Sequence, residues 1–94
     1  MTVAVVADVH GVLPALDAVL AEGAELVLLD NFDVTITAEA VRRRDAVAPG
    51  TGLESSGGLT LAVAGDYART GVDFVAVGAL THSVTALDLG LDLD

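Results

Sequence analysis

The sequence predicts an α/β fold built from repeated βα units with parallel strands. Two observations support this prediction: short apolar runs alternate with segments of helical periodicity, and the units recur every ~22–25 residues. Strands that repeat in this way run parallel and are joined by right-handed crossovers. A complete (β/α)8 barrel needs about 250 residues. We therefore expect the 94 residues to form a partial (β/α) barrel of about four strands, with an open four-stranded sheet as the alternative.

The predicted strands are short runs of apolar and β-branched residues. Such nearly continuous runs are typical of parallel strands that are buried on both faces. The second strand is followed directly by the pair Asp30-Asn31, and a connection rich in Pro and Gly leads into the third, which is weak. The four strands are expected at residues 2–7, 25–29, 51–54 and 73–77.

Three helices are expected between these strands. Pro14 suits the first turn of the first helix, and Gly23 ends it. Thr37 and Thr60 are candidate N-caps of the second and third helices, because a threonine hydroxyl can accept a hydrogen bond from the first helical turn. The second and third helices are expected at residues 37–45 and 60–69.

Composition narrows the classes of partner. Four Arg, no Lys and fourteen acidic residues give a net charge of −10, which argues against binding to nucleic acid or to anionic membranes. We interpret the basic cluster at residues 42–44 as a solvated helix face, with an anion contact as the alternative. The apolar runs are far shorter than the ~20 residues that cross a bilayer. Without cysteines or a basic leader, the chain is expected to be one cytoplasmic domain without disulfides.

Two glycine-containing segments, residues 53–58 and 77–83, each follow an apolar run. Gly57 and Gly58 remove side-chain bulk, Ser56 adds a hydroxyl donor, and a following helix start adds a partly positive end. Two such segments about one βα unit apart predict a phosphorylated ligand held between adjacent strand ends. The alternative is a pair of ordinary glycine turns.

Three further residues carry groups that can bind ligands. Asp30 ends a strand, where it can hold Mg²⁺ or accept ribose hydroxyls, or else form a turn or helix cap. Glu54 precedes the glycine pair and can bind a metal or a hydroxyl, or be a satisfied loop carboxylate. His82 can donate to a phosphate, although a single histidine is more often structural.

From about Leu16 to Asp94 the chain resembles the C-terminal part of quinolinate phosphoribosyltransferase. The resemblance is carried by Glu-Leu-Val-Leu-Leu-Asp-Asn-Phe, Leu-Glu-Ser-Ser-Gly-Gly-Leu and Gly-Val-Asp-Phe-Val-Ala-Val-Gly-Ala-Leu-Thr-His-Ser, in that order. It implies an α/β barrel domain that transfers phosphoribosyl from phosphoribosyl pyrophosphate to quinolinate in NAD biosynthesis. The implied products are nicotinate mononucleotide, pyrophosphate and CO₂, with Mg²⁺ required.

Asp30 lies in a matching motif, where it resembles the acidic residue with which that family contacts the ribose hydroxyls or the metal. The resemblance also implies two phosphate-binding segments: Ser56, Gly57 and Gly58 in the first, and Gly78, Ala79 and Leu80 in the second, with His82 beside it.

The chain differs from the family in its basic residues. The family binds its anionic substrates with several Arg and Lys, whereas this chain has no Lys and its Arg residues lie outside the matching motifs. We therefore expect the isolated chain to be inactive, since burial of a multiply charged anion without cations is unfavourable. We also expect homo-oligomers or association through exposed strand edges.

The first twenty residues resemble the opening of calcineurin-like metallophosphoesterases, in which an Asp-x-His pair binds metal. Asp8 and His10 match that pair, but the later elements of that family are missing. We accordingly treat residues 1–22 as an atypical first βα unit and residues 23–94 as the phosphoribosyltransferase-like part. A metallophosphoesterase, or a phosphate-binding module without catalysis, remain alternatives.

Overall fold

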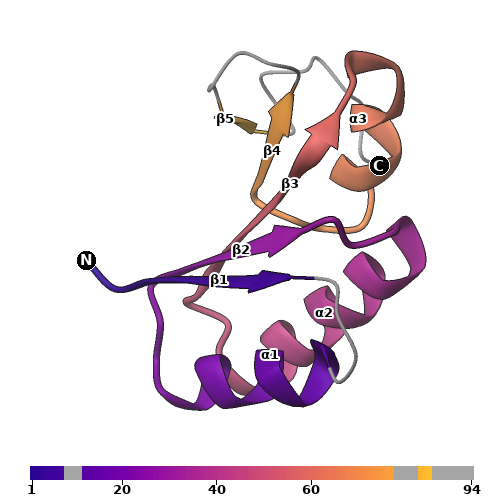
Figure 1. The fold of residues 1–94 in the computed structure, drawn as a ribbon. Helices are drawn as coiled ribbons and strands as arrows, with labels where there is room; N and C mark the ends of the chain where they lie inside the picture. Colours follow the sequence, from indigo (N-terminus) through magenta and orange to yellow (C-terminus); the bar gives the residue numbers. More distant parts are fainter. Residues whose placement is uncertain (8–11, 78–82, 86–94) are drawn as a thin grey trace.

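The computed structural model describes residues 1–7, 12–77 and 83–85. Helices and strands alternate along the chain (Figure 1). In order, the elements are β1 (Val3–Ala7), α1 (Val12–Ala21), β2 (Leu26–Asp30), α2 (Val34–Val47), β3 (Gly52–Leu59), α3 (Leu61–Ala68), β4 (Phe74–Val77) and β5 (Ser83–Thr85).

All five strands belong to one sheet, in the order β1-β2-β3-β4-β5. The pairs β1–β2, β2–β3 and β3–β4 are parallel, which confirms the predicted α/β fold with four parallel strands and is consistent with part of a (β/α) barrel. The short β5 pairs antiparallel with β4. We did not predict it, because three residues with no alternating pattern carry too little signal.

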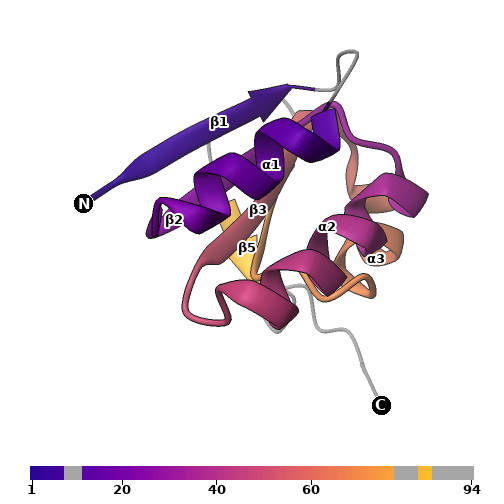
Figure 2. The same cartoon turned by 90° about the horizontal axis from the view of Figure 1, so that it is seen from below.

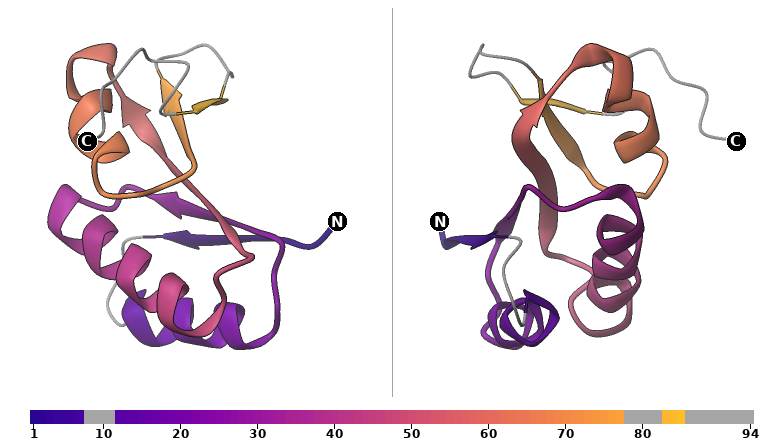
Figure 3. Two further views of the ribbon diagram at one scale, coloured as in Figure 1. Left: turned by 180° about the vertical axis from the view of Figure 1, so that it is seen from behind. Right: turned by 45° about the vertical axis from the view of Figure 1, so that its right-hand side comes forward.

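The three helices lie on one side of the sheet (Figures 2 and 3). The side chains between the helices and the sheet form the core. It includes Leu16 and Leu20 from α1 and Val27, Leu29 and Leu53 from the strands, all almost fully buried. Removal of apolar surface from water stabilises a fold by about 25 cal/mol per Å². Because this layer holds the buried apolar side chains, it is the main source of stability for the fold.

The opposite face of the sheet is more open. On β1, Val3 and Val5 are 49% and 64% exposed. Val6, whose side chain points to the other face of the strand, is buried. The prediction that every strand is buried on both faces is therefore wrong for β1. The reason is that the described helices cover one face only.

The predicted boundaries of the second helix are wrong. Helix α2 begins at Val34, and its N-cap is Asp33, whose side chain accepts a hydrogen bond of 2.7 Å from Ile36 N. Thr37 lies inside the first turn instead, where its buried hydroxyl donates to the Asp33 carbonyl. Aspartate is a better N-cap than threonine, and the hydrogen bond from Ile36 N shows that Asp33 takes this role here.

Thr60 is the N-cap of α3 by backbone conformation, as predicted, although its side chain makes no capping hydrogen bond. The third strand is longer than predicted, because β3 continues through both glycines to Leu59. In the part of the chain that the structure describes, no helix is both long enough and apolar enough to cross a bilayer.

Candidate functional site

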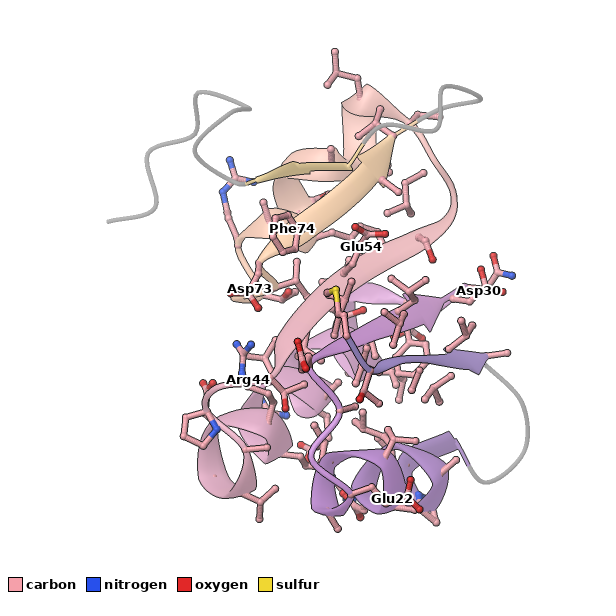
Figure 4. All side chains as sticks on the ribbon, turned by 90° about the vertical axis from the view of Figure 1, so that its left-hand side faces the viewer. Glu22, Asp30, Arg44, Glu54, Asp73 and Phe74 are labelled. Carbon is pink, nitrogen blue, oxygen red and sulfur yellow. The ribbon has the colours of Figure 1, made fainter. Side chains whose placement is uncertain are left out.

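Asp30 and Ser56 lie opposite each other at the carboxyl ends of β2 and β3. They are register partners in the parallel ladder, and both are partly exposed. The residues before them, Leu29 and Ser55, are buried on the helix-covered face. Because side chains alternate along a strand, Asp30 and Ser56 both belong to the open face. Figure 4 shows Asp30 at the tip of β2.

The glycine pair after Ser56 forms an irregularity within β3. Between two successive β3–β4 partners, Ser55↔Val75 and Leu59↔Val77, β3 advances by more residues than β4. Gly57 and Gly58 take up the excess with φ values of 105° and 75°. These conformations favour glycine. The predicted loop is thus a bulge inside the strand, which keeps the segment next to Asp30.

The turn after Asp30 is held from two directions. Asn31 has φ of 62°, and its backbone N donates to the Ser56 carbonyl over 3.0 Å. The hydroxyl of Tyr67, on α3, donates to the Phe32 carbonyl over 2.8 Å. Desolvation, with a smaller contribution from Asp33, raises the pKa of Tyr67. The sequence reasoning missed both Asn31 and Tyr67 as contributors to the site.

A signal for Asn31 was present in the sequence. Asparagine tolerates the left-handed backbone conformation better than other residues with side chains, and Asn31 directly follows a strand. No comparable signal exists for Tyr67, because its partner Phe32 is 35 residues away.

Glu54 lies deeper in the sheet than Asp30. It pairs with Leu28 of β2 and Phe74 of β4, two residues before Ser56 on the same face. Figure 4 shows Glu54 beside Phe74, in the middle of the sheet. Glu54 therefore lies two positions further from the carboxyl end of β3 than Ser56 does.

The opposite end of the sheet contains an ion pair between the buried Arg44 and the partly exposed Asp73. Nη1 of Arg44 donates to Asp73 Oδ2 over 2.8 Å and to the Thr51 carbonyl over 2.9 Å. Asp73 Oδ2 also accepts from Leu53 N over 2.8 Å. Burial lowers the pKa of Arg44, but hydrogen bonds with Asp45 and Asp73 outweigh it and raise that pKa.

Arg44 itself is only 7% exposed. The interpretation of residues 42–44 as one solvated face is therefore wrong for Arg44. Arg42 and Arg43 do lie further out and pair with Glu39, whose pKa the hydrogen bonds from both arginines lower. The distinction follows from helical geometry, since three consecutive residues point about 100° apart and cannot share a face.

The described residues include no group of three or more His, Cys, Asp or Glu side chains placed to hold a metal ion. Asp30 and Glu54 nevertheless supply hard carboxylate oxygens on the open face. Mg²⁺ is commonly bound by one or two carboxylates, with water and substrate phosphates completing the shell. The donor chemistry therefore fits Mg²⁺ shared with a phosphorylated ligand.

Several residues of the sequence-based prediction lie outside the described residues. They are the two proposed phosphoesterase ligands and the second phosphate segment: Asp8, His10, Gly78, Ala79, Leu80 and His82. Their roles stay predictions.

Comparison with curated proteins finds relatives that share one enzyme name. The chain is 65% identical over 81 residues to the carboxylating nicotinate-nucleotide pyrophosphorylase of Mycobacterium leprae, a match that covers 86% of this chain and 28% of the relative. It is 36% identical over 85 residues to a probable enzyme of the same name from Methanocaldococcus jannaschii, covering 86% and 30%. The Rattus norvegicus enzyme is 38% identical over 71 residues, covering 76% and 24%.

The chain thus spans 24–30% of the length of these relatives. By contrast, the match to a protein family covers nearly the whole of this chain. Residues 3–92 match quinolinate phosphoribosyl transferase, C-terminal domain, and this match includes the first βα unit that we treated as atypical. The chain belongs to the quinolinate phosphoribosyl transferase family, as part of its C-terminal domain.

Proposed function

We propose that this chain forms the phosphoribosyl-binding part of a quinolinate phosphoribosyltransferase. The observation that carries the proposal is the direct register pairing of Asp30 with Ser56 at the carboxyl ends of β2 and β3. Parallel α/β sheets bind their ligands at this end. In the proposed complex, Ser56 and the Gly57-Gly58 bulge hold the 5′-phosphate while Asp30 accepts hydrogen bonds from the ribose hydroxyls.

The proposed reaction is displacement at C1 of phosphoribosyl pyrophosphate. The C1–O bond breaks and its electron pair leaves with pyrophosphate, while the ring nitrogen of quinolinate forms the new bond to C1. The adjacent carboxylate leaves as CO₂, and a proton replaces it on the ring. The residues of this chain contribute by holding the ribose and its phosphate in place and by setting a negative charge near the developing cation at C1.

We also propose Mg²⁺ as the cofactor. Asp30, with Glu54 below it, would hold the ion on the open face, and the bound ion would neutralise part of the pyrophosphate charge.

The arginines support the proposal that the isolated chain does not turn over substrate. All four form ion pairs with acidic side chains: Arg42 and Arg43 with Glu39, Arg43 also with Asp17, Arg44 with Asp45 and Asp73, and Arg69 with Asp66. Since the chain has no Lys, the cations needed for pyrophosphate and the quinolinate carboxylates would come from another polypeptide.

Calorimetry and a product assay together test this proposal. Ribose 5-phosphate is expected to bind the purified chain in the presence of Mg²⁺, and Asp30→Asn or Ser56→Ala to weaken that binding about tenfold, the equivalent of ~1.4 kcal/mol. No nicotinate mononucleotide should form from quinolinate and phosphoribosyl pyrophosphate. Equal affinity in the wild type and both variants would contradict the site.

A second arm separates an incomplete enzyme from a binding module without catalysis. The part of the Mycobacterium leprae relative that this chain does not match is co-expressed with it. Turnover that appears only in the combined sample, and is lost with Asp30→Asn, supports an incomplete transferase. Ligand binding without turnover in the combined sample supports a non-catalytic module.

We further propose that the chain acts in the cytoplasm and associates with other copies or with a completing polypeptide. Among the described strands, β1 pairs with β2 alone, so its outer edge presents backbone groups that can bind another strand. Light scattering over a dilution series tests this proposal. A monomer at all concentrations would contradict self-association.

A further inference from the structure

Asn31 and Gly57 face each other one position beyond the Asp30–Ser56 pair. A Cβ atom built on Gly57 would overlap Asn31 Oδ1, and it would lie 2.7 Å from the Asn31 backbone nitrogen and 2.9 Å from Asn31 Cγ. Real Cβ atoms do not approach other atoms so closely. The amide side chain of Asn31 therefore lies directly against the Gly57 backbone, in space that only glycine leaves open.

The neighbouring glycine provides an internal comparison. Gly58 also has positive φ, at 75°, but a Cβ at that position would meet no atom within 4 Å. The close contact is thus specific to Gly57 and does not result from positive φ alone. Positive φ at Asn31 does not explain its side chain either, because glycine would adopt φ of 62° with less strain.

Asn31 is itself held in a fixed position. Its backbone N–H bonds to the Ser56 carbonyl, and the next residue, Phe32, is buried and bonded through its carbonyl to Tyr67. Asp33 then caps α2. A side chain mounted on a turn fixed by β3, α3 and α2 can set the position of whatever it contacts.

We propose that Asn31 is a positioning residue, whose side chain holds the Gly57 bulge at a fixed position relative to Asp30. One ligand can then place its phosphate at the bulge and its ribose at Asp30 at the same time. This inference rests on the proposed function, since it concerns the same site. Asn31 acts through Gly57 and needs no contact with the ligand. Its expected effect is on ligands that span both parts of the site.

The ligand arm of the test compares two probes by calorimetry. Ribose 5-phosphate needs the bulge and Asp30 in the correct relative position, whereas inorganic phosphate needs the bulge alone. Asn31→Gly, which keeps the backbone conformation available, is expected to weaken ribose 5-phosphate binding about tenfold and phosphate binding less than twofold. An equal loss for both probes would mean that Asn31 shapes the bulge itself, which overturns the proposal.

A stability arm tests the contact without any ligand. Gly57→Ala is expected to raise the unfolding equilibrium constant about tenfold more than the matched control Gly58→Ala, because only the first introduces an overlap. In the Asn31→Gly background, this excess should fall at least threefold, since the overlap with Oδ1 and Cγ is gone. It should not vanish, because the Asn31 nitrogen remains.

The two arms separate the possible failures. If the wild-type chain binds neither probe, the proposed function is overturned, and with it the role of Asn31 in ligand binding. If the double-mutant cycle is additive, the Asn31–Gly57 contact is overturned even when the chain binds ribose 5-phosphate. Coupling in the cycle together with a selective loss of ribose 5-phosphate binding supports the inference.

Discussion

The two ends of the sheet differ in how their charged residues are used. At the amino end, Arg44 and Asp73 are bonded to each other and to backbone atoms of β3 and its flanking segments. At the carboxyl end, Asp30 has no hydrogen bond or ion pair from its side chain to any other described residue. Figure 4 shows the two groups at opposite ends of the strands.

This difference bears on the stability of the fold. A carboxylate bonded to other groups of the chain contributes to stability, whereas one with no partner among the described residues adds little to it, and the proposed function gives Asp30 its role in binding. In barrels of this kind, residues at the amino end of the sheet serve stability and those at the carboxyl end serve function. Asp73 lies at the amino end and Asp30 at the carboxyl end, although the residue type is the same.

The largest effect is expected from Arg44→Met. It removes the donor to the Thr51 carbonyl and the cation paired with Asp73, which keeps its hydrogen bond from Leu53 N. Removal of one partner from a fully buried ion pair typically destabilises by about 3–5 kcal/mol. Because Asp73 is 44% exposed, we expect about 2–3 kcal/mol in urea unfolding. The control is Arg69→Met, whose exposed pair with Asp66 should change stability by less than about 0.5 kcal/mol. Equal effects of the two substitutions would remove the distinction.

The matched pair Asp73→Asn and Asp30→Asn tests the comparison directly. The first weakens the ion pair with Arg44 and is expected to lower the free energy of unfolding by about 1–2 kcal/mol. The second removes a charge without a described partner, so the change should stay within about 0.5 kcal/mol. A large loss of stability with Asp30→Asn would show that the carboxyl end also serves the fold.

Tyr67→Phe tests how the turn after Asp30 is held. Loss of the hydrogen bond to the Phe32 carbonyl should lower the free energy of unfolding by about 1 kcal/mol. The pKa of Tyr67 is raised in the folded state. The Tyr67 hydroxyl therefore contributes its full stabilisation below the pKa of the unfolded state, which is about 10. That contribution is lost as pH rises through the folded pKa.

The chain has one tyrosine, so phenolate absorbance reports on Tyr67 alone, and no lysine titrates in the same pH range. The alkaline loss of stability should follow that absorbance in the wild type and be smaller in Tyr67→Phe. An identical alkaline loss in both proteins would show that another group causes it.

The smallest effect is expected from Ser55→Ala. The Ser55 hydroxyl is buried on the helix-covered face and has no hydrogen-bond partner among the described residues. Its removal should raise the free energy of unfolding slightly, by about 0.5 kcal/mol or less. The control is Thr51→Val, which leaves the Ala24 carbonyl without its donor and should destabilise by about 1 kcal/mol. A clear loss with Ser55→Ala would indicate a partner for that hydroxyl.

Much of the fold could be predicted because the signals are local. The apolar runs and the residues around them located four strands and three helices, and Thr60 and Gly23 marked helix ends as expected. The errors arose where a local choice was ambiguous. Asp33 and Thr37 are both able to cap a helix, and the structure shows that Asp33 does so.

The candidate site was predictable in part. Asp30, Ser56 and the two glycines were found from residue type and position, and the structure describes them together at one end of the sheet. Asn31 and Tyr67 were missed because their importance depends on contacts with distant residues. The role of Arg44 was misjudged for the same reason, since Asp73 lies 29 residues away.

The sequence alone therefore determined the order of strands and helices and the residue types at the strand ends, since both follow from short-range pattern and backbone preference. Only the tertiary structure decided which charged groups are bonded to other described residues, as Arg44 and Asp73 are, and which are not, as in the case of Asp30. That outcome depends on strand register and helix packing, which bring residues together that are 20 to 35 positions apart.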